Sequence, residues 1–194
     1  MIKKFLSDSI PKFFYEFETE EPFKHCSLCN RELSDSDKYA VEKVLKQNKK
    51  INKAEIVYEY AMCWDCASEM GDEISEESKE SIVNLYQDHS ENVMMKLDYL
   101  HRTEKYNIES WLERCTFTGK ETRVCGEYSV SGIIEGGKLL YEHSPVVVSD
   151  EFMEKMQEVL SEKTKEFLDG LKDELIYSPS EFNDIINSPT VGLF

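Results

Sequence analysis

The sequence is poor in positive charge and lacks the motifs of common enzymes. Its 194 residues include 23 lysines and arginines against 39 aspartates and glutamates, a formal net charge of −16. Because DNA and RNA binding depends on contacts between basic side chains and phosphates, this balance argues against a general nucleic-acid-binding protein. The chain contains no GxSxG, GxGxxG, HExxH or Walker A motif. The four histidines are scattered: His25, His89, His101 and His143. We therefore expect no catalytic residues and no enzymatic activity.

Long apolar runs are also missing. No stretch approaches the ~20 apolar residues that span a bilayer. The opening MIKKFLSDSIPKFF has neither the unbroken apolar region nor the small-residue cleavage site of a signal peptide. Four of the six cysteines stand in CxxC pairs, which is typical of metal binding in a reducing compartment. We expect a cytoplasmic protein that does not contact membranes.

The two CxxC pairs are the most informative feature of the sequence. Cys26 and Cys29 form the first pair and Cys63 and Cys66 the second, with 33 residues between the pairs. Each CxxC turn directs two thiolates at one ion about 2.3 Å away, and two such turns complete a tetrahedron. The sequence therefore predicts one structural Zn²⁺ held by these four cysteines. Four thiolates leave no coordination position for a reactive water, which argues against metal-based hydrolysis at this site.

The elements between and after the cysteines predict an α+β module. Residues 39–45 and 54–62 alternate as the strands of a hairpin, and a helical sequence follows Cys66. This order of knuckle, β-hairpin and helix resembles a treble-clef zinc finger from Cys26 to about Ser90. The resemblance implies a metal site but no particular function, because treble-clef proteins serve nucleic-acid binding, protein binding and catalysis alike. The whole chain also looks like uncharacterised bacterial proteins with paired CxxC motifs.

The second half of the sequence repeats the first. A shift of 89 places Cys26 on Cys115 and Tyr39 on Tyr128, and after the hairpin a shift of 86 places Ser75 on Ser161. The three missing residues fall in the hairpin, where Glu135-Gly-Gly-Lys138 predicts a tight turn. We interpret this as an internal duplication. The expected organisation is an aromatic-rich segment (1–24), a zinc-binding treble-clef-like module (25–90), a linking helix (91–114), a degenerate repeat without metal (115–176) and a tail (177–194).

The repeat has lost most of its ligands. The four zinc ligands correspond to Cys115, Thr118, Ser149 and Phe152, so one thiol of four is kept and the second site is expected to be empty. Gly119 corresponds to Asn30, and both residue types tolerate the positive φ that a zinc knuckle requires. A competing hypothesis is a rearranged metal site, with catalytic potential, built from Cys115, Cys125 and His143.

Three other segments give structural expectations. We expect residues 1–24 to lie over the protein's own core, although a partner-docking arm is the alternative. Residues 150–176 carry an apolar stripe that predicts one long helix. The tail contains Pro179 and Pro189 and ends in Val191-Gly-Leu-Phe194, which suits either a recognition peptide or packing on the protein's own surface.

Composition and motifs favour an acidic adaptor or scaffold that acts in protein–protein interaction, stabilised by zinc. The alternative is an acidic inhibitor or immunity-type protein that mimics nucleic-acid charge and binds a basic partner. One basic stretch breaks the acidity and gives a weaker hypothesis of nucleic-acid contact; it consists of Lys43, Lys46, Lys49, Lys50 and Lys53.

Overall fold

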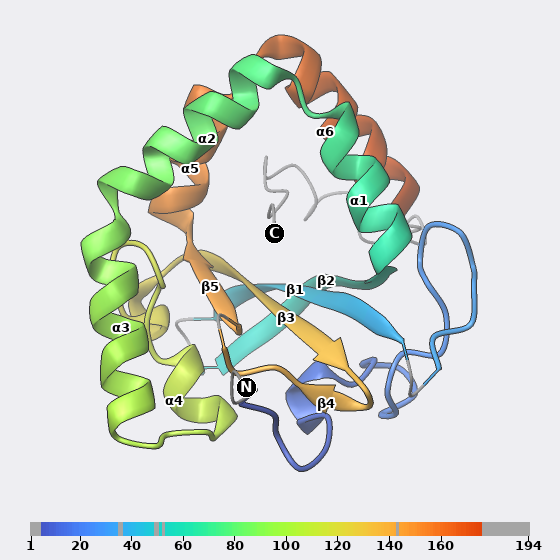
Figure 1. The fold of residues 1–194 in the computed structure, drawn as a ribbon, viewed down its shortest axis with the longest axis vertical. Helices are drawn as coiled ribbons and strands as arrows, with labels where there is room; N and C mark the ends of the chain where they lie inside the picture. The colour runs from blue at the N-terminus through green and yellow to red at the C-terminus, as the bar shows by residue number, and fades with distance from the viewer. Residues whose placement is uncertain (1–4, 35–36, 49–50, 52, 143, 176–194) are drawn as a thin grey trace.

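The computed structural model describes residues 5–34, 37–48, 51, 53–142 and 144–175. The predicted α+β class is confirmed. A five-stranded antiparallel sheet has the strand order β2-β1-β3-β4, and β5 also pairs with β3 (Figure 1). The strands are β1 (Lys38–Asn48), β2 (Lys53–Cys63), β3 (Glu127–Glu135), β4 (Lys138–Leu139) and β5 (Val146–Ser149).

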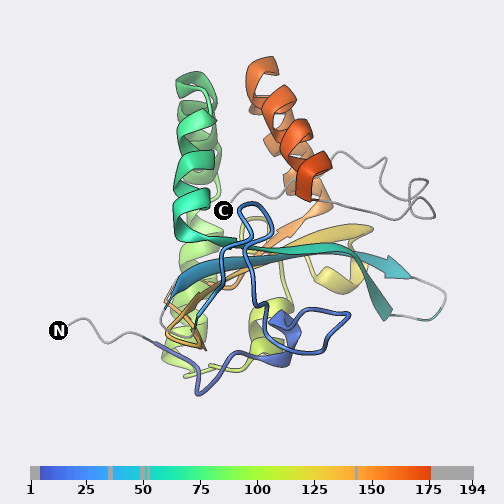
Figure 2. The ribbon, with the colours of Figure 1, turned by 90° about the vertical axis from the view of Figure 1, so that its right-hand side faces the viewer.

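The β1–β2 hairpin forms as the alternating sequence predicts. Tyr39 pairs with Cys63 at the end near the helices, and Asn48 pairs with Lys53 beside the turn. The strand β1 is buried on both faces over residues 39–45, because it is central in the sheet, with helix pairs on one face and the N-terminal segment on the other (Figure 2). Alternation alone predicts that one of two neighbouring strand residues is exposed, but Glu42 and Lys43 are both buried.

The second hairpin, β3–β4, closes through the predicted tight turn. Gly136 and Gly137 have φ values of 62° and 69°, as the two central residues of a type I′ turn require. After β4 the chain returns as β5, which pairs Tyr128 with Ser149 and Ser131 with Val146. Thus β3 has β1 on one side and the short strands β4 and β5 on the other.

Two helix pairs stand on one face of the sheet and converge at the end far from it (Figure 1). The first is α1 (Trp64–Glu73) with α2 (Glu76–Asp88), and the second is α5 (Asp150–Val159) with α6 (Glu162–Leu175). The prediction of one long helix over residues 150–176 is therefore wrong. The helix ends at Leu160, which is extended (φ −78°, ψ 142°). A new helix begins because the Ser161 hydroxyl accepts the Thr164 N–H at 3.3 Å, which is a capping interaction. Residue 176 and the tail lie outside the described residues.

A cluster of four hydroxyl side chains joins the two helix pairs where they converge. Ser75 caps α2, and its hydroxyl lies 2.9 Å from that of Ser161. The bonds between the pairs are reciprocal: the Ser75 N–H donates to the Thr164 hydroxyl at 3.2 Å, and the Ser161 N–H donates to the Ser78 hydroxyl at 2.9 Å. Each helix start is therefore partly capped by a side chain of the other pair.

The N-terminal segment covers the opposite face of the sheet (Figure 2). A short 3₁₀ turn, Lys12–Phe14, places Phe14 in the core at 1% exposure. The ring of Phe14 sits where a side chain at Gly132 would be, 2.5 Å from an ideal Cβ position. The aromatic side chains of residues 5–24 thus pack mainly on the protein's own core, as expected, although Phe17 is 70% exposed.

Two more helices lie beside the sheet between the halves of the chain. They are α3 (Ser90–Arg102) and α4 (Ile108–Leu112), separated by a turn within the predicted linking region 91–114. Trp111 of α4 is fully buried, and its indole N–H donates to the Lys105 carbonyl at 2.8 Å. Within the described residues, no helix combines the length and apolar character that crossing a lipid bilayer requires.

Candidate metal centre

The first CxxC pair lies in a tight knuckle. The Cys26 N–H donates to the Arg31 carbonyl at 2.8 Å, and the Asn30 N–H donates to the Cys26 carbonyl at 2.9 Å. Asn30 has a φ of 56°, the positive value predicted for this position. The Ser27 N–H donates to the Ala61 carbonyl at 2.8 Å, which fixes the knuckle against the end of β2.

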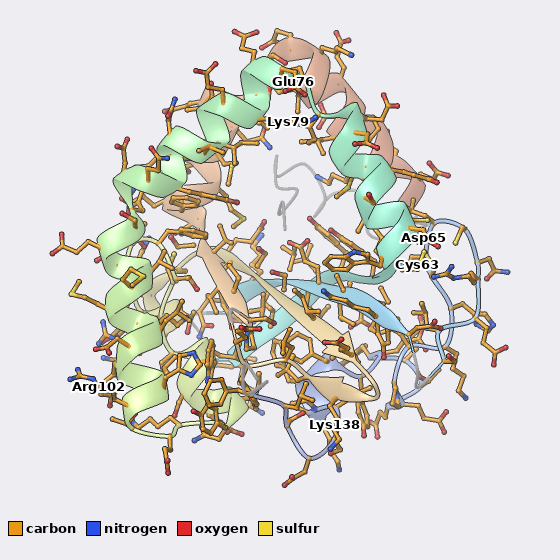
Figure 3. The ribbon with its side chains drawn as sticks, in the orientation of Figure 1. Cys63, Asp65, Glu76, Lys79, Arg102 and Lys138 are labelled. Atoms are coloured by element: carbon orange, nitrogen blue, oxygen red, sulfur yellow. The ribbon has the colours of Figure 1, made fainter. Side chains whose placement is uncertain are left out.

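The second pair lies where β2 passes into α1, at the position of Cys63 and Asp65 in Figure 3. Cys63 is the last residue of the strand, and Cys66 falls in the first turn of the helix. The first turn of a helix has unpaired N–H groups and the positive end of the helix dipole, both of which favour a thiolate. The hairpin and helix start therefore hold this pair opposite the knuckle.

The four sulfur atoms form one cluster. All of them lie within 4.8 Å of one another, and the Sγ atoms of Cys29 and Cys63 are 3.8 Å apart. A zinc–sulfur bond of about 2.3 Å in a regular tetrahedron gives sulfur–sulfur distances of about 3.8 Å. Cys26 and Cys63 are buried, Cys66 is partly buried and Cys29 is exposed. The four cysteines are thus positioned to hold a metal ion, and the arrangement is compatible with zinc.

Hydrogen bonds to sulfur set the charge of the cluster. Burial raises the pKa of the Cys26 thiol, but the N–H groups of Cys29, Cys63 and Leu28 outweigh it and lower the pKa to about 7. The Cys63 N–H donates to the Cys26 sulfur at 3.4 Å. Burial and the neighbouring thiols raise the pKa of Cys66. Because a metal ligand must be deprotonated, the cation would supply the charge that keeps all four thiolates together.

Two exposed side chains of α1 lie beside the cysteine cluster. Trp64 lies between two of the ligands and is 44% exposed, with the Lys38 ammonium 3.8 Å from the centre of its ring. Asp65 accepts a hydrogen bond from Arg31 of the knuckle at 2.6 Å. This ion pair is largely exposed and adds little stability.

The region around Cys115 has the backbone of a second knuckle. The Cys115 N–H donates to the Lys120 carbonyl at 2.8 Å, and the Gly119 N–H donates to the Cys115 carbonyl at 3.1 Å. Gly119 has a φ of 70°. The Thr116 N–H donates to the Val147 carbonyl at 2.7 Å. Each of these bonds has its equivalent in the first knuckle at an offset of 89 or 86 residues.

Packed side chains occupy the space that corresponds to the metal. The hydroxyls of Thr118 and Ser149 are 3.3 Å apart, and the N–H groups of both residues donate to the Cys115 sulfur at 3.4 Å. Phe152 is fully buried and stacks on Phe117 with ring centres 4.2 Å apart. Burial raises the pKa of the Cys115 thiol, but the hydrogen bonds from Ser149 and Thr118 outweigh it and lower the pKa.

The structure describes two of the three residues in the hypothesis of a rearranged second metal site. Cys115 and Cys125 are both buried, and the Cys125 thiol donates to the Glu121 carbonyl at 3.5 Å. Among the described residues, neither thiol belongs to a group of three or more potential metal ligands. His143, the third residue of that hypothesis, lies outside the described residues.

The lysines of the predicted basic stretch do not share one environment in the fold. Lys43 is buried at 2% exposure and forms an ion pair with Glu59 of β2, while it also donates to the Tyr15 carbonyl. It is therefore unavailable to a phosphate. Lys46 and Lys53 are exposed, and Lys49 and Lys50 lie outside the described residues. Alternation in the sequence does not predict the burial of Glu42 and Lys43, since only the strand order reveals that β1 is central. No sequence pattern indicates the exposed Trp64 beside the cluster.

Comparison with known proteins adds nothing to this site: no family model, no curated protein and no solved structure matches the chain.

Proposed function

We propose that the protein is a zinc-stabilised, non-enzymatic protein that acts through contacts with another protein, as an adaptor or scaffold. The four-sulfur cluster carries this proposal, because sulfur atoms within 4.8 Å of one another suit one tetrahedral ion. Four thiolates close the coordination sphere, so the ion supports the fold and activates no water. The energy of metal binding then becomes folding energy for the knuckle, the hairpin and the start of α1.

The proposed architecture is two treble-clef-like modules related by duplication, of which the first binds metal. Three features support it. The knuckles at Cys26 and Cys115 have equivalent hydrogen bonds and positive φ values at Asn30 and Gly119. The paired helices begin 86 residues apart in both cases, α1 with α5 and α2 with α6. In the proposed degenerate module, Phe152 belongs to the same buried apolar cluster as Cys115 and Phe117, and apolar packing can replace a polar centre without loss of stability.

The exposed apolar side chains favour protein partners. The described residues of α1, α2 and α3 expose several large apolar side chains to 44% or more: Trp64, Val83, Met94, Met95 and Tyr99. Trp64 and Val83 line one concave surface, and Met95 and Tyr99 line another; exposed apolar surface of this kind is typical of interaction sites. Because an apolar contact does not depend on opposite charges, the partner of this acidic protein need not be strongly basic.

Two measurements test the proposal. Elemental analysis of the purified protein should find one zinc per chain, whereas two metals per chain would support the rearranged site and reopen catalysis. Affinity capture from the host's cell extract should recover a partner that remains bound at about 0.5 M salt. A partner lost over that range would instead support charge mimicry, because screening at that ionic strength removes most exposed electrostatic attraction.

A further inference from the structure

An apolar groove lies under the first helix pair. It has a volume of about 660 Å³ and is formed by α1, α2 and the sheet face below them. Its apolar lining includes Trp64, Met70, Ile74, Ile82, Val83 and Ile133. Two of these side chains, Trp64 and Val83, are 44% and 51% exposed. Small side chains at Ala40 and Ser131 form part of the floor.

The two exposed apolar residues of the lining are specific to this helix pair. At positions 86 residues further along the chain, Trp64 and Val83 correspond to Asp150 of α5 and Asp169 of α6. Lys79 is the only charged residue in the described lining. It also pairs with the exposed Glu76 at 2.8 Å, on the same helix (Figure 3). The groove therefore suits an apolar segment that carries negative charge.

The segment that follows α6 has this chemistry. Residues 176–194 contain eight large apolar residues: Ile176, Tyr177, Phe182, Ile185, Ile186, Val191, Leu193 and Phe194. They include two acids, Glu181 and Asp184, and no lysine or arginine. Figures 1 and 2 place the end of α6 towards the sheet, across from α1. Nineteen residues can reach about 60 Å when extended, several times the ~15 Å length of α1.

We propose that this groove is an intramolecular docking site for residues 176–194 of the same chain. A tethered segment is favoured over a free acidic peptide, because a short linker gives an effective concentration of about 1 mM while the net charge of −16 repels other acidic molecules. The inference goes beyond the proposed function, since it concerns a contact within one chain. It can be tested without any partner.

The test uses full-length chains and a labelled peptide of residues 176–194. One chain is the natural sequence. A second, the depleted chain, carries Phe182→Ser, Ile185→Ser and Ile186→Ser. A matched control changes polar residues of the same segment, with Ser180→Ala, Asn183→Ser and Asn187→Ser. Peptide binding is measured by fluorescence anisotropy, and the oligomeric state of each chain is measured by size-exclusion chromatography with light scattering.

We expect the peptide to bind the depleted chain with a Kd of about 100 µM or tighter. The natural chain and the matched control should bind it about tenfold more weakly, because a segment at about 1 mM effective concentration occupies the groove about 90% of the time at that Kd. Adding Val83→Asp to the depleted chain should abolish peptide binding, whereas Asp169→Ala at the corresponding position of α6 should not change it.

Three results would overturn the inference. The first is failure of the peptide to bind the depleted chain in its folded, zinc-loaded form. The second is equal binding to the natural and depleted chains, which would show that the tethered segment does not occupy the groove. A dimer present in the natural chain and lost in the depleted chain would show that the segment binds a second copy instead.

Discussion

Glu42 of β1 and Ser131 of β3 lie directly opposite each other in the sheet, and they are 89 residues apart. Cys26 and Cys115 have the same separation. On either side, Tyr39 pairs with Ile134 and Leu45 pairs with Tyr128. A shift of 89 residues relates these two pairs, because Tyr39 corresponds to Tyr128 and Leu45 corresponds to Ile134. The offset of 89 found in the sequence therefore places the local two-fold axis between β1 and β3 at this pair, as expected for two copies of one module, and this supports the proposed duplication.

Loss of a single sulfur should remove the metal. We expect Cys63→Ser to abolish stoichiometric zinc binding and to lower the free energy of unfolding by several kcal/mol, because structural zinc contributes about 10–16 kcal/mol in small zinc peptides. Elemental analysis and chemical denaturation measure both effects. Cys125→Ser is the control, since Cys125 is buried outside the cluster and should leave the zinc content at one. Zinc retained by a folded Cys63→Ser chain would contradict the four-sulfur assignment.

Restoring the lost ligands should create a second metal site. The triple variant Thr118→Cys, Ser149→Cys and Phe152→Cys places three more thiols beside Cys115, and we expect two zinc ions per chain. Removing the Phe152 ring should cost about 3–5 kcal/mol without metal, so the melting temperature of this variant should rise on adding zinc. The same triple variant with Cys115→Ser is the control and should bind one ion. A folded triple variant that still binds only one would count against the duplication.

The buried ion pair between Lys43 and Glu59 should be costly to break. Lys43→Met leaves the Glu59 carboxylate, which is 13% exposed, without its partner, and we expect a loss of about 3–5 kcal/mol in urea denaturation. The double variant Lys43→Met/Glu59→Leu should recover most of that loss, because the unpaired charge is removed. Lys46→Met on the same strand is exposed and should change stability by less than about 0.5 kcal/mol. Equal losses at both lysines would mean that Lys43 is not buried.

Glu42 should make stability depend on pH near neutrality. Burial raises the pKa of Glu42 to about 7, although the Tyr60 hydroxyl donates to the carboxylate at 2.6 Å. A raised acid pKa stabilises the fold fully below the ordinary value of 4.5, and this contribution is lost as the pH rises through 7. Relative to Glu42→Gln, which cannot ionise, the natural chain should lose about 3 kcal/mol between pH 5 and pH 8.

Comparing the two chains at each pH cancels the titration of the cysteines, which both share. Denaturation curves at several pH values supply the measurement. A constant difference between natural and Glu42→Gln chains from pH 5 to pH 8 would show that Glu42 keeps an ordinary pKa.

Local features of the fold were predictable because short-range signals specify them. The alternation of β1 and β2 and the Gly136-Gly137 turn need no long-range information. The four cysteines come together because the hairpin brings Cys63 back beside the knuckle. The strands and the turn follow from neighbouring residues, and the CxxC spacing shows which cysteines the hairpin brings together.

Other features depend on contacts between distant segments. The apolar stripe of residues 150–176 continues across Ser161, so periodicity alone gives one helix, yet the hydroxyls of Ser75 and Ser78 bind at that point and favour a break. The burial of Lys43 depends on the central place of β1 in the sheet and on the N-terminal segment, whose Tyr15 carbonyl accepts from the Lys43 ammonium. The apolar groove combines two helices with residues of β1, β3 and β5, and no local pattern indicates it.

The four hydroxyls of Ser75, Ser78, Ser161 and Thr164 have a consequence for how the molecule melts. Each of them serves the start of a helix and the contact between the two halves at once. Separation of the two halves would therefore remove capping bonds from both α2 and α6. We expect the two halves to unfold together. Calorimetry should record one heat-absorption peak for the zinc-loaded chain, in spite of its repeated plan.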